Sequence, residues 1–180
     1  MSNQRYSSLL GMLGQQTTKR KVFVSFHHGN DRRWFDEFTK LFSETYDVFY
    51  DQSVDGSIRS NDAEYVDRRI REEFITGLSV TVVLCGSETW KRKYVDWEIY
   101  STLHCEHGLL GIALPTVSRN GQAAVVPERL HQNIQSGFGH FINWNTDPNF
   151  IKQEIERAFT MSRDISKIKN SEPKMQRNKA

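Results

Sequence analysis

Short apolar segments alternate along this chain with longer segments in which apolar residues recur every three or four positions. The short segments predict strands at 22–26, 48–50, 80–84, 109–114 and 140–144. The longer ones predict helices around 34–42, 62–77, the region of Glu98 and 150–159. Alternation of this kind predicts an α/β fold with a mostly parallel five-stranded sheet between two helical layers, a flavodoxin-like three-layer sandwich.

The remaining segments divide the chain. Residues 51–60 read as a long loop, and residues 116–137 show no strand or helix pattern and are predicted to be irregular. We place the domain at 20–162, after an N-terminal extension of residues 1–19. Residues 163–180 carry six Lys or Arg against two Asp or Glu, and we expect them to form a basic, disordered tail.

Composition excludes several classes of function. The chain has no run of about 18 apolar residues, so no membrane span is predicted, and its start lacks the apolar core of a secretory signal. Cys85 and Cys105 are interpreted as reduced thiols, which is typical of a cytosolic protein. Most of the positive charge lies in the tail, so a nucleic-acid partner is not expected of the domain.

One carboxylate has a position of interest. Glu98 belongs to the segment Tyr94-Val95-Asp96-Trp97-Glu98, which begins a helix soon after the strand at 80–84. In open α/β sheets, ligands bind beyond the carboxyl ends of the strands. Tyr94 and Glu98 are four positions apart, so they share a helix stripe at the edge of the buried face. A carboxylate beside an aromatic ring fits a pocket, although a solvated surface glutamate explains the same position.

The turn after the first strand is a second candidate feature. It reads His27, His28, Gly29 and Asn30 and is followed by a helix. The free N–H groups at a helix N-terminus suit phosphate. A capped turn with two exposed histidines explains these residues equally well. The chain contains neither G-x-G-x-x-G nor G-x-x-x-x-G-K-[ST], so a Rossmann or Walker nucleotide site is not supported.

Two other readings are excluded. His104 and His107 share a helix face, but no second Cys/His cluster accompanies them, whereas zinc needs three or four protein ligands; no metal site is predicted. A phosphorelay receiver domain has the same sheet topology, but it needs an acceptor Asp after its third strand. This chain has Cys85-Gly86 there.

Several segments resemble those of TIR domains. Val22-Phe23-Val24-Ser25-Phe26 with its polar turn is similar to the opening TIR strand, and Val48-Phe49-Tyr50-Asp51 is similar to the second. The segment containing Glu98 resembles the Trp-x-x-x-Glu segment that carries the catalytic glutamate of NAD-cleaving TIR enzymes, with Tyr94 where many of them have Trp. Together with the two histidines and the segment 82–90, the likeness is nearest to the TIR-like ThsB proteins of bacterial Thoeris anti-phage systems. It covers roughly residues 20–160.

The resemblance implies a cytoplasmic enzyme that, once infection is sensed, cleaves NAD⁺ at the nicotinamide–ribose bond, with Glu98 as the catalytic residue and no cofactor. Substrate-binding residues carried over from it are Phe26, His27, His28, Asp51, Ser87 and Tyr94. The implied product is a cyclic ADP-ribose-type signalling nucleotide that activates a separate effector protein. A phage-derived trigger and self-association through TIR surfaces are also implied. The product isomer, and whether turnover needs activation, stay open.

Two alternatives remain at this stage. A non-catalytic TIR adaptor would act through protein–protein contacts, using the loop at 51–60, and would not need Glu98. A nucleoside deoxyribosyltransferase-like enzyme would have a related sheet and would use a carboxylate in the same role, but on deoxynucleosides.

Overall fold

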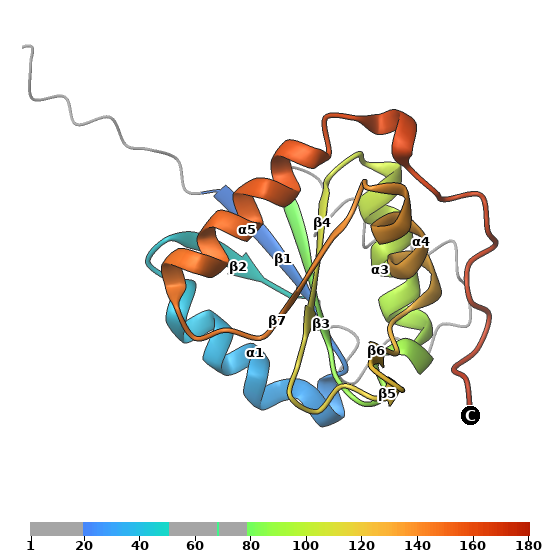
Figure 1. The fold of residues 1–180 in the computed structure, drawn as a ribbon, viewed down its shortest axis with the longest axis horizontal. Coiled ribbons are helices and arrows are strands. Elements are labelled where there is room, and N and C mark those ends of the chain that lie inside the picture. Colours follow the sequence, from blue (N-terminus) through green and yellow to red (C-terminus); the bar gives the residue numbers. More distant parts are fainter. Residues whose placement is uncertain (1–19, 51–67, 69–78) are drawn as a thin grey trace, which may run out of the picture.

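A five-stranded parallel sheet forms the centre of the protein (Figure 1). The computed structural model describes residues 20–50, 68 and 79–180. Within them the sheet has the order β2-β1-β3-β4-β7, and all four strand pairs are parallel. The strands are β1 (Arg20–Ser25), β2 (Tyr46–Phe49), β3 (Val80–Cys85), β4 (Gly108–Ala113) and β7 (His140–Asn143). The predicted parallel five-stranded α/β fold is therefore confirmed.

The strand order creates a place for a ligand. β2 is added on one side of β1, and the chain then returns to add β3 on the other side of β1. The chain direction across the sheet thus reverses between β1 and β3, as in flavodoxin-like folds, where ligands bind at the carboxyl ends of the two strands beside this reversal.

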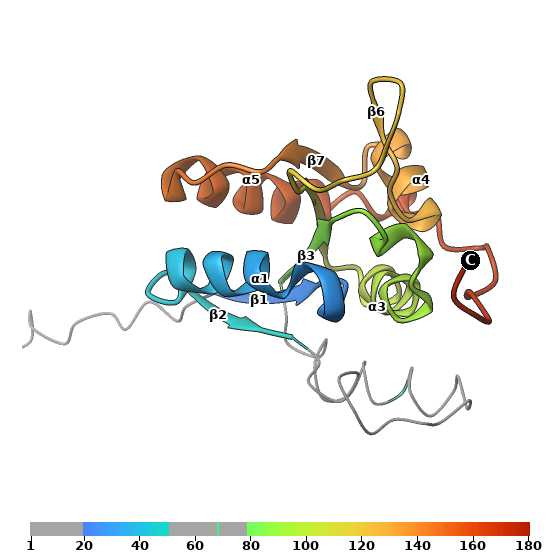
Figure 2. The ribbon, with the colours of Figure 1, turned by 90° about the horizontal axis from the view of Figure 1, so that it is seen from below.

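Helices cover both faces of the sheet, as Figure 2 shows from the edge. On one face, α1 (His28–Phe42) and α5 (Pro148–Met161) bury a core that includes Phe38 and Ile155. On the other face, α3 (Lys93–His104) and α4 (Glu128–Ser136) bury a second core that includes Ile99. No helix among the described residues is long and apolar enough to cross a membrane.

The predicted elements agree with the structure where an unbroken apolar pattern exists. All six residues of β3 and all six of β4 are buried, which explains why both read as continuous apolar runs. The second strand begins at Tyr46, two residues before its predicted start, and ends one residue earlier. The helix predicted at 62–77 and the loop at 51–60 lie outside the described residues, apart from Arg68.

The prediction of an irregular segment at 116–137 is wrong. The structure has a two-stranded antiparallel hairpin there, β5 (Arg119–Asn120) and β6 (Ala123–Ala124), followed by α4. The helix has nine residues, of which only Leu130 and Ile134 are apolar, and two polar side chains, Arg129 and Asn133, share its buried face. Two apolar positions in so short a segment are not enough to identify a helix by hydrophobic periodicity.

The last residues also differ from expectation. The sequence predicts a disordered tail at 163–180, whereas the structure has a 3-10 helix (Ile165–Lys167) followed by an extended segment along the outer side of α3 and α4 (Figure 1). Hydrogen bonds hold this segment to the domain, for example from Trp97 Nε1 to the Met175 carbonyl at 2.7 Å. Buried polar groups on the two helices give the segment specific partners, which net charge alone does not reveal.

Candidate functional site

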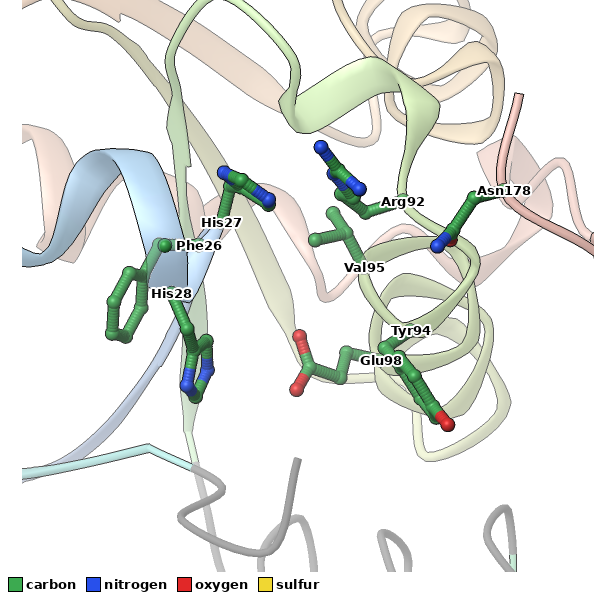
Figure 3. A pocket seen from close by; sticks show the side chains of 9 residues that line it. Phe26, His27, His28, Arg92, Tyr94, Val95, Glu98 and Asn178 are labelled. Carbon is green, nitrogen blue, oxygen red and sulfur yellow. The ribbon is translucent and has the colours of Figure 1, made fainter. Parts of the chain in front are cut away.

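A cavity of about 360 Å³ opens at the carboxyl end of β1, between the turn that follows this strand and the first turns of α3 (Figure 3). This is the position at which a flavodoxin-like sheet binds ligands. The residues that line it are Phe26, His27, His28, Gly29, Arg92, Tyr94, Val95, Glu98 and Asn178.

Glu98 is the carboxylate of this cavity. It lies in the second turn of α3, only 3% exposed, and its side chain points toward the turn after β1 (Figure 3). Ser25, the last residue of β1, donates a hydrogen bond of 2.5 Å from Oγ to Glu98 Oε2. A carboxylate removed from water needs such donors, and the bond also fixes the direction in which the group faces the cavity.

His27 is held in one orientation by the start of α1. It is the N-cap of that helix, and its Nδ1 accepts a hydrogen bond from the Asn30 backbone N–H at 3.1 Å. Because Nδ1 accepts, the neutral ring carries its proton on Nε2. Burial, together with the positive charge of Arg92, lowers the pKa of His27 below its usual 6.5, so the ring stays neutral at physiological pH. His27 therefore offers an N–H donor rather than a base.

His28 forms an aromatic wall. Its ring stacks on Phe26 at 4.4 Å between centroids with an angle of 6° between planes, and Tyr50 contacts it edge-on at 5.6 Å. Phe26 also stacks on Phe35 at 4.8 Å and is only 2% exposed. The ring of Phe26 is thus taken up by protein contacts, and it supports His28 instead of offering a free face to a ligand.

Arg92 brings a positive charge to the opposite wall. Its Nη2 donates to Glu88 Oε2 at 2.7 Å, while its Nε is buried without a hydrogen-bond partner in the structure. A buried guanidinium N–H without an acceptor is costly, and an anionic ligand oxygen would relieve it. Hydrogen bonds from Lys91 and charge from both neighbouring cations lower the pKa of Glu88, which stays ionised and orients Arg92.

A buried carboxylate on α1 positions the segment that leads to Arg92. Asp31 is 1% exposed, and Thr89 Oγ1 lies 3.0 Å from its Oδ2 and accepts the Gly86 N–H at 2.8 Å. Gly86 is required here, because a Cβ at this position would lie 2.1 Å from Asp31 Oδ1. Burial raises the pKa of Asp31 above its ordinary value of 3.8.

The structure brings together five of the seven site residues predicted from the sequence: Glu98, Phe26, His27, His28 and Tyr94. Ser87 is not among the cavity residues. It lines a separate cavity beneath the β5–β6 hairpin, where its carbonyl accepts a hydrogen bond from Ser118 Oγ at 2.9 Å. Asp51 lies outside the described residues.

Five residues of the site were not among those predicted from the sequence: Ser25, Gly29, Arg92, Val95 and Asn178. Ser25 left a signal, since it is the one polar residue in the apolar segment 22–26. Arg92 directly precedes the helix that carries Glu98, and it is four positions after Glu88, but the segment 86–93 reads as a loop, where this spacing does not predict an ion pair. Asn178 belongs to the segment taken for a disordered tail and left no signal.

Comparison with known proteins gives one family assignment. The family model described as Thoeris protein ThsB, TIR-like domain, matches residues 23–119, a range that holds the second half of β1, the two histidines and Glu98. Among solved structures, the TIR domains in the structure of the activated Roq1 resistosome directly recognizing the pathogen effector XopQ are similar at 14% identity, over 84% of this chain and 86% of that chain, with a TM-score of 0.39. No curated protein sequence matches the chain. Because the family model spans more than half of its residues, the chain belongs to the TIR-like domain family of Thoeris protein ThsB.

Proposed function

We propose that this TIR-like defence protein cleaves NAD⁺ at the bond between nicotinamide and ribose, with Glu98 as its catalytic residue. The observation that carries the proposal is the buried carboxylate of Glu98, the one acidic side chain among the described residues that line the cavity. Ser25 fixes it with a hydrogen bond of 2.5 Å, and the N–H donor of His27 and the cation of Arg92 line the same cavity. The family assignment supports the same reading.

NAD⁺ chemistry needs only one carboxylate. The nicotinamide ring nitrogen is positively charged, so the electron pair of the broken C1′–N bond neutralises it and no acid has to protonate the leaving group. This differs from ordinary glycoside hydrolysis, which uses two carboxylic acids. The ribose develops oxocarbenium character, and a fixed carboxylate in a water-poor site stabilises that charge. In the proposal, Glu98 is the carboxylate that stabilises this charge.

The other walls suit the rest of a dinucleotide. The Nε2–H of His27, the guanidinium of Arg92 and the backbone at the start of α1 are donors for diphosphate oxygens. Gly29 lines the cavity without a side chain, so a ligand can approach the backbone there. His28 and Tyr94 offer aromatic surface on opposite sides of Glu98 (Figure 3).

The fate of the ribose decides the product. Attack by water gives ADP-ribose, whereas attack by a nucleophile of the same nucleotide gives a cyclic ADP-ribose isomer when water is excluded. We propose the cyclic type of product, read by a separate effector protein. NAD⁺ is a substrate in this scheme, and no cofactor takes part. A phage-derived trigger and self-association of TIR surfaces belong to the same proposal.

The test compares small molecules from phage-infected cells that express wild type, Glu98→Gln or Glu44→Gln, by mass spectrometry. Glu44 is an exposed glutamate just after α1 and provides the matched control. We expect a nucleotide that lacks nicotinamide in wild type and Glu44→Gln and its loss in Glu98→Gln. Identical small molecules with intact defence in all three strains would refute cleavage and support an adaptor. Turnover of deoxynucleosides but not NAD⁺ would identify a deoxyribosyltransferase-like enzyme.

A further inference from the structure

The segment 169–179, here named the C-terminal strap, runs from α4 along α3 to the mouth of the cavity (Figures 1 and 3). Its first residue is held by Asn133 of α4 through two bonds: Asn133 Nδ2 donates to the Lys169 carbonyl at 2.8 Å, and the Lys169 N–H donates to Asn133 Oδ1 at 2.9 Å. Asn133 is buried, so this end of the strap is fixed to the core.

A buried ion pair anchors the middle of the strap. Arg129 of α4 is 2% exposed and donates from Nε to Asp96 Oδ1 of α3 at 3.0 Å. Its remaining N–H groups donate to Asn170 Oδ1 at 2.9 Å and to the carbonyls of Glu172 and Pro173 at 3.1 Å. A buried guanidinium is stable only when its donors are used, and here the strap supplies most of the acceptors.

The second partner of the ion pair also holds the strap. Asp96 Oδ2 accepts the Met175 N–H at 2.8 Å, and the buried Trp97 donates from Nε1 to the Met175 carbonyl at 2.7 Å. Both backbone groups of Met175 are thus tied to α3, through the two residues that directly precede Glu98. The strap is therefore fixed by the same helix that carries the catalytic carboxylate.

Asn178 is where the strap meets the cavity. Its Oδ1 accepts the Lys93 N–H at 2.9 Å, which caps α3, a helix whose own N-cap residue Arg92 gives no side-chain cap. The next residue is held as well, since the Lys179 N–H donates to the Lys91 carbonyl at 2.9 Å. With Oδ1 engaged, the Asn178 amide turns its Nδ2 toward the cavity (Figure 3).

We infer that the C-terminal strap is a wall of the nucleotide site, in which Asn178 donates from Nδ2 to an oxygen of the bound nucleotide and the Asp96–Arg129 pair positions it. The ligand class, a dinucleotide with ribose and diphosphate acceptors, rests on the proposed function. Asn178 is a binding residue, whereas Asn170, which bonds Arg129 and the Tyr100 carbonyl, is a positioning residue outside the cavity.

The test for Asn178 uses ADP-ribose, which keeps both riboses and the diphosphate but has no nicotinamide to lose. Its affinity for the full chain is measured by calorimetry. Asn178→Asp keeps the acceptor that caps Lys93 but removes the donor and adds a negative charge. We expect its Kd to rise about tenfold at an unchanged melting temperature. Gln176→Ala is the control, because the Gln176 side chain bonds only the strap's own Lys174 carbonyl, and we expect its Kd to stay at the wild-type value.

The test for positioning uses Asn170→Ala, because loss of Arg129 itself would leave Asp96 buried without its partner. We expect a Kd about threefold higher, together with faster hydrogen exchange at the Lys179 amide, which a local effect at position 170 would not produce. Equal affinity in wild type and Asn178→Asp overturns the role of Asn178, and unchanged affinity and exchange in Asn170→Ala overturn the positioning. If wild type binds no ADP-ribose at all, the proposed ligand class is contradicted. That outcome differs from measurable and equal affinities in wild type and Asn178→Asp, which would contradict only the role of Asn178.

Discussion

Ser25 at the end of β1 and Glu98 on α3 lie 73 positions apart, and the hydroxyl of the first donates to the carboxylate of the second at 2.5 Å. The bond joins β1, an interior strand of the sheet, to the helix beside the cavity. It therefore ties the orientation of the proposed catalytic group to the core of the sheet and not to a loop.

Ser25→Ala should lower activity more than it lowers stability. Without the hydroxyl, Glu98 loses a fixed donor, so we expect kcat for NAD⁺ cleavage to fall about tenfold, with a smaller change in KM. The buried carboxylate also loses a hydrogen bond, which costs about 1–3 kcal/mol of unfolding free energy. Steady-state kinetics and urea unfolding measure the two effects. Ser166→Ala, the same change at an exposed position of the 3-10 helix Ile165–Lys167, should alter neither. Equal kcat in all three proteins would show that Ser25 does not orient Glu98.

His27→Asn should separate the two functions of this histidine. The Asn Oδ1 can still accept the Asn30 N–H as an N-cap, but the distal N–H donor is lost. We expect stability to change by less than about 0.5 kcal/mol, whereas His27→Ala, which loses the cap too, should lose about 1 kcal/mol. Both variants should bind NAD⁺ more weakly by a similar factor. Full binding by His27→Asn would show that the Nε2–H is not used.

The same histidine makes stability depend on pH. The fold lowers the pKa of His27 below 6.5, so the unfolded chain takes up a proton before the folded protein does. The contribution of His27 is present above pH 6.5 and is lost as the pH falls through its folded pKa. Relative to His27→Asn, wild type should therefore lose unfolding free energy as urea titrations are moved from pH 7 to lower pH. A constant difference between the two proteins would contradict the lowered pKa.

Most of the fold, and part of the site, could be predicted from the sequence. β3 and β4 were recognisable because burial on both faces requires an unbroken apolar run. The histidine turn and Glu98 were placed correctly because strand ends and helix faces follow from the same pattern. α4 was missed because its buried face carries Arg129 and Asn133, whose burial depends on partners far along the chain.

Two of the errors in the site, at Ser87 and Asn178, come from tertiary pairing between polar groups, and a third, at Phe26, comes from ring stacking. Ser87 was expected in the pocket, but its carbonyl is bonded to Ser118 and its segment faces the β5–β6 hairpin. Phe26 was expected to bind the substrate, but the ring of His28 stacks on it. Asn178 lies at the cavity in a strap that Arg129 and Asp96 bond to the domain, and no local sequence pattern encodes that arrangement.

Asp31→Asn should stabilise the protein at neutral pH. The unfolded carboxyl has a pKa near 3.8, and burial raises it in the fold, so the folded protein holds a proton that the unfolded chain has released. Wild type therefore loses stability as the pH rises from 3.8 through the raised pKa, and Asn, which does not ionise, avoids this loss. Chemical unfolding of both proteins at several pH values from about 4 to about 8 measures the effect. The unfolding free energy of Asp31→Asn relative to wild type should increase with pH.

Gly86→Ala tests whether Asp31 fixes the segment that carries Arg92. The new Cβ would lie 2.1 Å from Asp31 Oδ1 and 2.4 Å from Oδ2, and Asp31 cannot withdraw because it is buried and bonded to Thr89. We expect a loss of about 1–3 kcal/mol of unfolding free energy, as for other overpacked sites. Asp31→Ala removes the obstruction, so the double variant should be less destabilised than the sum of the two single variants. Additive losses would mean that the two residues do not press on each other, and the position of Arg92 would then depend on Glu88 alone.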